Sequence, residues 1–127
     1  MLQQGRIIWA SVPRPDGSPG KPRTAVIVTA TAEINDTDPF VVVAITSAFQ
    51  EPLRDAEVRL PFHPQGGGRI GPQAPTVAVC DWLVELRKSQ VLQEVGSLPT
   101  ILMIEIVEKT RSYIHLIQKV PSTPQEQ

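Results

Sequence analysis

One stretch decides the fold: Phe40-Val41-Val42-Val43-Ala44-Ile45-Thr46-Ser47. Its apolar, mostly β-branched residues follow one another without interruption, which is typical of a strand buried in a sheet. The segment before it, Asn35-Asp36-Thr37-Asp38-Pro39, favours a turn because Asn and Asp side chains bond to nearby backbone groups. The stretch therefore predicts a strand that begins after a tight polar connection.

Other segments with strand character lie on both sides of it. They are Gly5–Ser11, Arg23–Thr29, Ala56–Leu60, Thr76–Trp82 and the short Val91–Val95. Between the first two, the stretch from Val12 to Pro22 holds four prolines and two glycines, which predicts a loop and excludes a helix or a central strand. The glycine-rich stretch from Pro64 to Pro72 predicts a second loop.

A single helix is expected near the C-terminus, over Leu98–Ile117. Pro99 suits its first turn, and four residues share one face at helical spacing: Leu102, Ile106, Tyr113 and Ile117. Several short strands followed by one helix predict a small, mainly β (α+β) barrel with an appended helix. We expect one domain over residues 1–120 and a disordered tail over residues 121–127.

Composition limits the classes of function. The chain has 127 residues, 41% of them hydrophobic and 20% charged, which fits one globular domain. With 12 Lys and Arg against 13 Asp and Glu, the net charge of −1 does not indicate a nucleic-acid binder by itself. No apolar run is long enough to cross a bilayer and no targeting signal is visible, so we expect a soluble, cytoplasmic protein without membrane contact.

The single cysteine, Cys80, excludes an intramolecular disulfide and a cysteine-based metal cluster. His63 and His115 are too far apart in sequence for a local metal motif, so we expect neither metal nor cofactor. Because free cysteines are among the most buried residues and no histidine lies near Cys80 in sequence, it is interpreted as structural rather than nucleophilic.

Three polar side chains stand where strands begin or end. Arg23 is either a solvated charge or a fork for a phosphate, and Thr46 either binds a ligand or satisfies the backbone. Asp81 is either a turn-former or a general base. Trp9 and Trp82 are expected in the core or at a dimer interface rather than as stacking platforms for bases.

The ordered set of segments resembles a known family, the PemK/MazF toxins of type II toxin–antitoxin systems, the group that includes Kid. The resemblance runs from about Gly5 to Ile117. It rests on Gly5-Arg6-Ile7-Ile8-Trp9, a Pro/Gly loop with Gly20, Arg23-Thr24-Ala25-Val26-Ile27-Val28, Val41–Ser47, Val77-Ala78-Val79-Cys80-Asp81 and the C-terminal helix.

The resemblance implies an SH3-like barrel, a homodimer, a cognate antitoxin partner, and metal-independent cleavage of single-stranded RNA (mRNA) through its 2′-hydroxyl. It places Arg23 at the phosphate, Thr46 at the RNA backbone and Asp81 as the base. Lys21 and Arg69 are expected to add local positive charge that binds RNA.

The chain departs from the family pattern in three places. The loop before Arg23 lacks the usual Glu-Gln pair, Thr24 replaces the usual proline, and Val79 stands where some members have an arginine. Loss of one acid–base group lowers a rate by about 10²–10⁴. Three hypotheses therefore stay open: a toxin that is an endoribonuclease, a catalytically impaired barrel that serves as a binding module, and a gyrase poison like CcdB.

Overall fold

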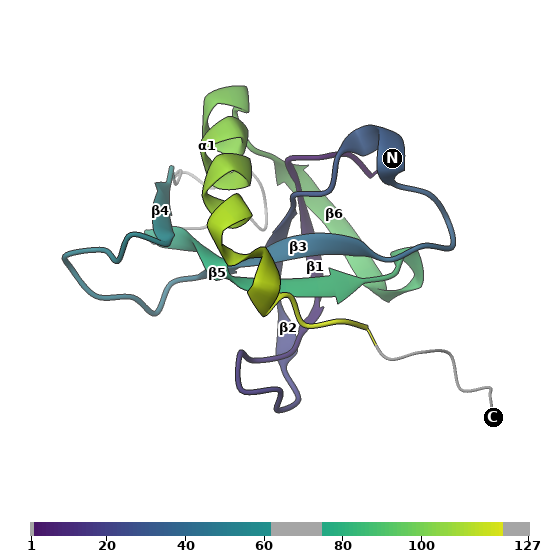
Figure 1. The fold of residues 1–127 in the computed structure, drawn as a ribbon, viewed down its shortest axis with the longest axis horizontal. Coiled ribbons are helices and arrows are strands. Elements are labelled where there is room, and N and C mark those ends of the chain that lie inside the picture. The colour runs from purple at the N-terminus through teal and green to yellow at the C-terminus, as the bar shows by residue number, and fades with distance from the viewer. Residues whose placement is uncertain (1, 62–74, 121–127) are drawn as a thin grey trace.

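The strand at residues 40–46 lies in the middle of an antiparallel sheet. In the computed structural model, which describes residues 2–61 and 75–120, β3 (Phe40–Thr46) pairs with β2 (Lys21–Ile27) and with β5 (Thr76–Leu86). The remaining strands are β1 (Arg6–Val12), β4 (Glu57–Leu60) and β6 (Val91–Ser97). The strand order is β4-β5-β3-β2-β1-β6, with α1 (Thr100–Thr110) lying against β5 (Figure 1).

Side chains of β3 alternate between two hydrophobic clusters, as expected of a strand covered on both faces. Phe40, Val42 and Ala44 belong to the inner cluster, whereas Val43 and Ile45 belong to the helix-side cluster. The inner cluster is completed by Leu2, Ile8, Ala10, Val12, Ala25, Ile27, Val84 and Leu86. The helix-side cluster is completed by Val26, Val58, Leu60, Ala78, Cys80, Leu83 and Ile106 of α1. Each large side chain in them contributes about 1.5–3 kcal/mol through burial.

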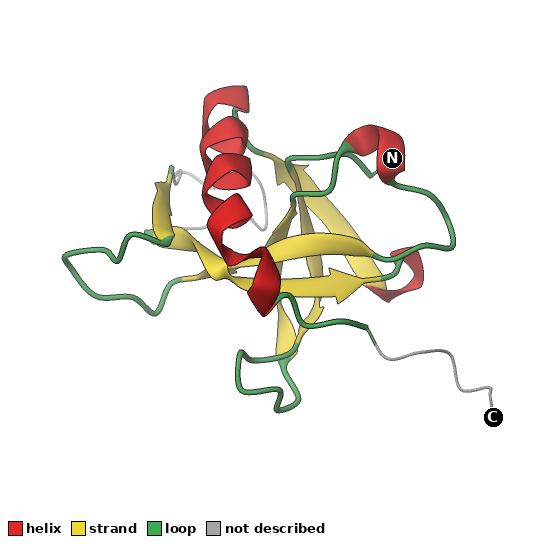
Figure 2. Ribbon diagram, viewed as in Figure 1, coloured by secondary structure: helices red, strands yellow, loops and turns green. Residues whose placement is uncertain are grey.

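The predicted fold class is confirmed: the protein is a small, mainly β, SH3-like domain with one C-terminal helix (Figure 2). Among the described residues, no helix is both long and apolar enough to cross a membrane. The predicted glycine-rich loop with Arg69 and the predicted tail at 121–127 lie outside the described residues.

The predicted helix is shorter than expected. The regular helix ends at Thr110 and continues as a 3₁₀ segment, η3 (Arg111–Leu116). Thr110 donates its hydroxyl hydrogen to the carbonyl of Val107 at 2.7 Å, a back-bond that bends helices. The predicted apolar face is confirmed, because Ile106 is buried and Leu102, Tyr113 and Ile117 pack against the helix-side cluster.

The predicted loop from Val12 to Pro22 is wrong at its two ends. Val12 pairs with Lys21 and Ser11 pairs with Pro22, so these residues extend β1 and β2. Within the described residues, Ala25–Ile27 is the part of β2 that pairs with β3. The outer half of β2 therefore has a free edge, and proline is tolerated in a strand at such an edge.

β5 contains a bulge at the point where it passes the middle of β3. Ala44 pairs with Val79, yet its neighbour Val43 pairs with Leu83. The residues between, Cys80-Asp81-Trp82, therefore stand opposite a single step of β3. Such bulges redirect side chains and are frequent beside functional sites.

Long-range contacts close the structure at both ends. β1 pairs with β6, which joins residues 6–10 to residues 91–97. After η3 the chain returns to β5, where Gln118 forms a parallel bridge with Val84. The N–H of Glu85 donates to the Gln118 carbonyl at 2.8 Å, and the Gln118 N–H donates to the Leu83 carbonyl at 3.0 Å.

Candidate functional site

The bulge of β5 sends three consecutive side chains to three different environments. Cys80 lies fully buried in the helix-side cluster, and burial raises the pKa of its thiol to about 12. A nucleophilic cysteine needs a lowered pKa, so the interpretation of Cys80 as structural is supported. Trp82 and Asp81 are partly buried, and each contacts an arginine from a different segment.

Trp82 holds Arg23 of β2. The guanidinium carbon of Arg23 lies 4.8 Å from the centroid of the Trp82 ring, a cation–π contact. The indole N–H of Trp82 donates to the Pro13 carbonyl at 2.8 Å, which fixes the ring. Trp82 also packs against the inner cluster, in agreement with its expected core position.

Arg23 carries an unused hydrogen-bond donor. Its Nε is buried and has no hydrogen-bond partner among the described residues. Burial, with a smaller contribution from Arg14, lowers the pKa of Arg23. Guanidinium donors match phosphate oxygens, and an unpaired buried donor is destabilising until a ligand satisfies it. Because this Nε is shielded from solvent, an anion reaches it only if neighbouring groups move.

Asp81 is paired with an arginine that the sequence did not single out. Arg54, in the loop between β3 and β4, donates from Nη1 to Oδ2 of Asp81 at 2.9 Å and from Nη2 to Oδ1 at 3.1 Å. This hydrogen bonding raises the pKa of Arg54, which stays charged. The Asp81 side chain is 25% exposed, so the carboxylate remains reachable from solvent.

Glu57, at the start of β4, holds Arg54 in turn. The Arg54 backbone N–H donates to Oε1 of Glu57 at 3.0 Å, and Nε of Arg54 lies 3.5 Å from Oε2. The Glu57 side chain is only 11% exposed. Glu57, Arg54 and Asp81 thus form a chain of charges, which we call the Arg54 clamp.

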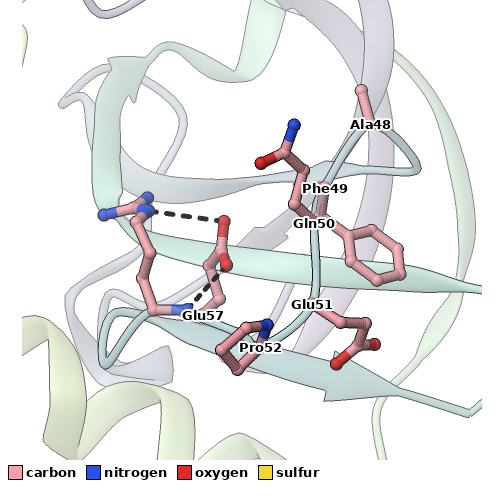
Figure 3. Close-up of a pocket in the computed structure, with 7 residues that line it drawn as sticks. Ala48, Phe49, Gln50, Glu51, Pro52 and Glu57 are labelled. Atoms are coloured by element: carbon pink, nitrogen blue, oxygen red, sulfur yellow. Dashed lines mark hydrogen bonds and ion pairs between the residues drawn. The ribbon is translucent and has the colours of Figure 1, made fainter.

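Thr46 ends β3 and starts the same loop. Its Oγ1 accepts the N–H of Ala48 at 3.0 Å, which begins a turn. The loop beyond it borders an open hollow of about 630 Å³ (Figure 3). The hollow is lined by Ala48, Phe49, Gln50, Glu51, Pro52, Arg54 and Glu57. Its wall therefore includes two members of the Arg54 clamp.

Of the three predicted catalytic residues, Arg23 and Asp81 are related only through the β5 bulge. Arg23 contacts Trp82, the residue that follows Asp81. The pairing of β2 with β3 ends at Ala25 and Ala44, so Arg23 is not paired with Thr46, whose partner is Val77 of β5. Across residues 2–61 and 75–120, no hydrogen bond or ion pair links Arg23, Thr46 and Asp81 directly.

Of the two predicted RNA-binding residues, Lys21 and Arg69, the structure describes Lys21. Lys21 is exposed on β2, two residues from Arg23. Arg69 lies outside the described residues. Val79, where some related toxins have an arginine, is an apolar residue 6% exposed and supplies no charge. In the described parts of the chain, His, Cys, Asp and Glu do not form groups of three that would suit a metal ion.

Comparison of the fold with solved structures gives clear similarities. A crystal structure of MazF from Deinococcus radiodurans is 21% identical, with a TM-score of 0.67 over 90% of this chain and 96% of that one. An endoribonuclease in complex with its cognate antitoxin, from a mycobacterial species, is 15% identical, with a TM-score of 0.66 over 91% and 97% of the two chains. The MazE–MazF complex of D. radiodurans is 18% identical, with a TM-score of 0.64 over 89% and 94%.

Sequence comparison assigns the family. The curated proteins give no match to the chain. A family model described as PemK-like, MazF-like toxin of type II toxin–antitoxin system matches residues 3–114, which span the sheet, the bulge and α1. The chain therefore belongs to the PemK-like, MazF-like toxins of type II toxin–antitoxin systems.

Proposed function

We propose that this protein is a metal-independent endoribonuclease that cleaves single-stranded RNA. The observation that carries the proposal is the contact of two charged groups with the β5 bulge: Asp81 belongs to it and has a partly exposed side chain, and the guanidinium of Arg23 lies over its Trp82 ring. Transfer of the phosphoryl group to a 2′-hydroxyl requires a proton acceptor near that hydroxyl and a cation near the phosphate.

The reaction uses RNA as its own nucleophile. Asp81 removes the proton of a 2′-hydroxyl, and that oxygen attacks the adjacent phosphorus. The bond to the 5′-oxygen of the next nucleotide breaks and that oxygen takes a proton from water, so that a 2′,3′-cyclic phosphate and a 5′-hydroxyl form. Arg23 stabilises the negative charge that grows on the phosphoryl oxygens, and Thr46 contacts the RNA backbone. Lys21 and Arg69 add positive charge along the substrate.

The partners that we propose are a second copy of the chain and a cognate antitoxin, in the cytoplasm. The solved relatives support the antitoxin, because several were crystallised with theirs. Exposed apolar side chains also support a protein contact: Ile101 and Ile104 on α1 are 80% and 53% exposed, and Leu92 on β6 is 62% exposed. Such surface favours protein association.

The direct test is to incubate the purified protein with single-stranded RNA in EDTA. We expect cleavage with a cyclic phosphate terminus, and its loss in Arg23→Ala by about 10²–10³. A protein that cleaves no RNA and causes no growth arrest on expression would contradict the proposal. Retained antitoxin binding in that case would identify a binding module, and inhibition of DNA gyrase would identify a gyrase poison.

A further inference from the structure

We propose that Arg54 is a positioning residue for Asp81. The inference rests on the proposed function, because it assigns Arg54 a role in the same reaction. It starts from the two parallel hydrogen bonds, 2.9 and 3.1 Å long, that Arg54 donates to both carboxylate oxygens. A planar fork that binds a carboxylate in this way sets both its position and its orientation.

Arg54 is held at both its backbone and its guanidinium, although its side chain is 55% exposed. Glu57 accepts its backbone N–H and lies beside its Nε. The adjoining loop is tied down on both sides: Lys109 of α1 donates to the Asp55 carbonyl at 3.0 Å, and the Cys80 N–H donates to the Ala56 carbonyl at 2.8 Å. The fork therefore meets the carboxylate from a rigid support rather than from a mobile side chain.

The pairing leaves Asp81 able to act as a base. Each carboxylate oxygen has about two acceptor sites, and Arg54 uses one on each oxygen. One site on each oxygen remains for a 2′-hydroxyl. By holding the carboxylate in one rotamer, Arg54 keeps these free acceptor sites in a fixed direction. That direction matters because misplacing a catalytic group by about 1 Å lowers the rate by about 10²-fold.

This role predicts a loss of rate without a loss of binding. We expect Arg54→Ala to lower kcat by roughly 10- to 100-fold, while KM changes less than about twofold. Affinity for an uncleavable 2′-O-methyl oligoribonucleotide should also stay within about twofold of the wild-type value. Arg54→Lys keeps one charged donor but not the fork, so it should restore part of kcat.

A double-mutant comparison separates positioning from a direct contact with RNA. If Arg54 acts through Asp81, Arg54→Ala should cause no further loss in an Asp81→Asn background. The matched control is Lys88→Ala, because Lys88 is also 55% exposed and also forms an ion pair, at 2.8 Å, but with Asp36. That variant should cleave like the wild type.

The outcomes separate the two proposals. A wild-type protein that does not cleave RNA overturns the proposed function and this inference with it. If the wild type is active, any of three results overturns this inference alone: Arg54→Ala keeps the wild-type kcat, the double variant loses more activity than Asp81→Asn, or Arg54→Ala loses affinity for the oligonucleotide. Thermal unfolding checks the fold of each variant, and Arg54→Lys carries the same comparison if Arg54→Ala does not fold.

Discussion

The two loops that flank β3 are both tied down by an ion pair, yet the pairs differ in kind. Before the strand, Asp36 meets Lys88 at 2.8 Å; after it, Arg54 meets Asp81 at 2.9 Å. The two cations are equally exposed, at 55%. The carboxylates are not, because Asp36 is 81% exposed and Asp81 only 25%. Contact distance alone therefore does not distinguish a surface tether from a prearranged site.

The surroundings explain the difference. In the first loop, Asn35 Oδ1 accepts the N–H groups of Thr37 and Asp38 at 2.9 and 2.8 Å. Lys88 and Arg87 each add one hydrogen bond from outside the turn, that of Arg87 to the Thr37 carbonyl at 2.8 Å. In the second loop, a nearly buried Glu57 supports the arginine. Exposed pairs contribute little because water screens them, whereas a supported bidentate pair is preorganised.

The largest expected effect comes from neutralising the two carboxylates. Asp81→Asn removes the proposed base and should lower the cleavage rate by about 10²–10⁴. Asp36→Asn should leave the rate unchanged, because its side chain faces solvent. Single-turnover cleavage of the same oligoribonucleotide by both variants measures the contrast, and equal rates for the two would remove the functional distinction between the loops.

A smaller effect is expected when the support of Arg54 is weakened. Glu57→Gln keeps the shape of the side chain and an acceptor oxygen but removes the charge beside Nε of Arg54. We expect kcat to fall by a factor of about five or less, the equivalent of about 1 kcal/mol. Steady-state kinetics gives the number. A loss as large as that of Asp81→Asn would show that Glu57 has a chemical role of its own.

The bond from α1 to the second loop should affect stability more than activity. Lys109→Ala removes one hydrogen bond, to the Asp55 carbonyl. The expected loss in the free energy of unfolding is about 0.5–1 kcal/mol, which urea denaturation measures. Amide hydrogen exchange should become faster in residues 54–56. An unchanged exchange rate there would mean that Glu57 and β5 hold the loop without help from the helix.

The smallest effect concerns the Asp36–Lys88 pair and its dependence on pH. The hydrogen bond from Lys88 lowers the pKa of Asp36 from its ordinary value of 3.8, and Asp36 raises the pKa of Lys88 from 10.5. The contribution of Asp36 is therefore present above pH 3.8 and is lost as pH falls through its lowered pKa. That of Lys88 is present below pH 10.5 and is lost as pH rises through its raised pKa.

Unfolding curves of the wild type and Lys88→Ala test this pH window. They should differ slightly at neutral pH and low salt, and converge at acid pH or in 1 M salt. A difference that persists in high salt would mean that the exposed pair is not screened by solvent, and would weaken the contrast between the loops.

The sequence predicts what local periodicity determines. The apolar run of β3 and the face of Ile106 on α1 were identified because an unbroken β-branched run and helical spacing are both visible within a few residues. The β5 bulge was not, because it depends on how Val43 and Ala44 register against a distant strand. The end of β1 at Val12 and the start of β2 at Lys21 and Pro22 were missed because a proline in a strand with a free edge looks like a loop.

The candidate site divides in the same way. Arg23, Thr46 and Asp81 match the family pattern and lie near the ends of predicted strands, although Arg23 and Asp81 lie inside β2 and β5 in the structure. Arg54 had no such signal, since its contact with Asp81 joins residues that are 27 positions apart. The charge of −1 also carried little information about the site. The folded sheet brings two arginines to one bulge, where Arg23 contacts Trp82 and Arg54 contacts Asp81.

The pairing of β1 with β6 and of Gln118 with β5 has a consequence for synthesis. A ribosome makes Arg23, Thr46 and Asp81 well before it makes the strand and helix that complete their scaffold. A nascent chain that ends before residue 91 contains all three groups but lacks β6, α1 and the Lys109 bond to the loop. Contacts between distant segments also form slowly. The scaffold of the site is thus complete only after β6, α1 and Gln118 have been made, which would delay any activity until then.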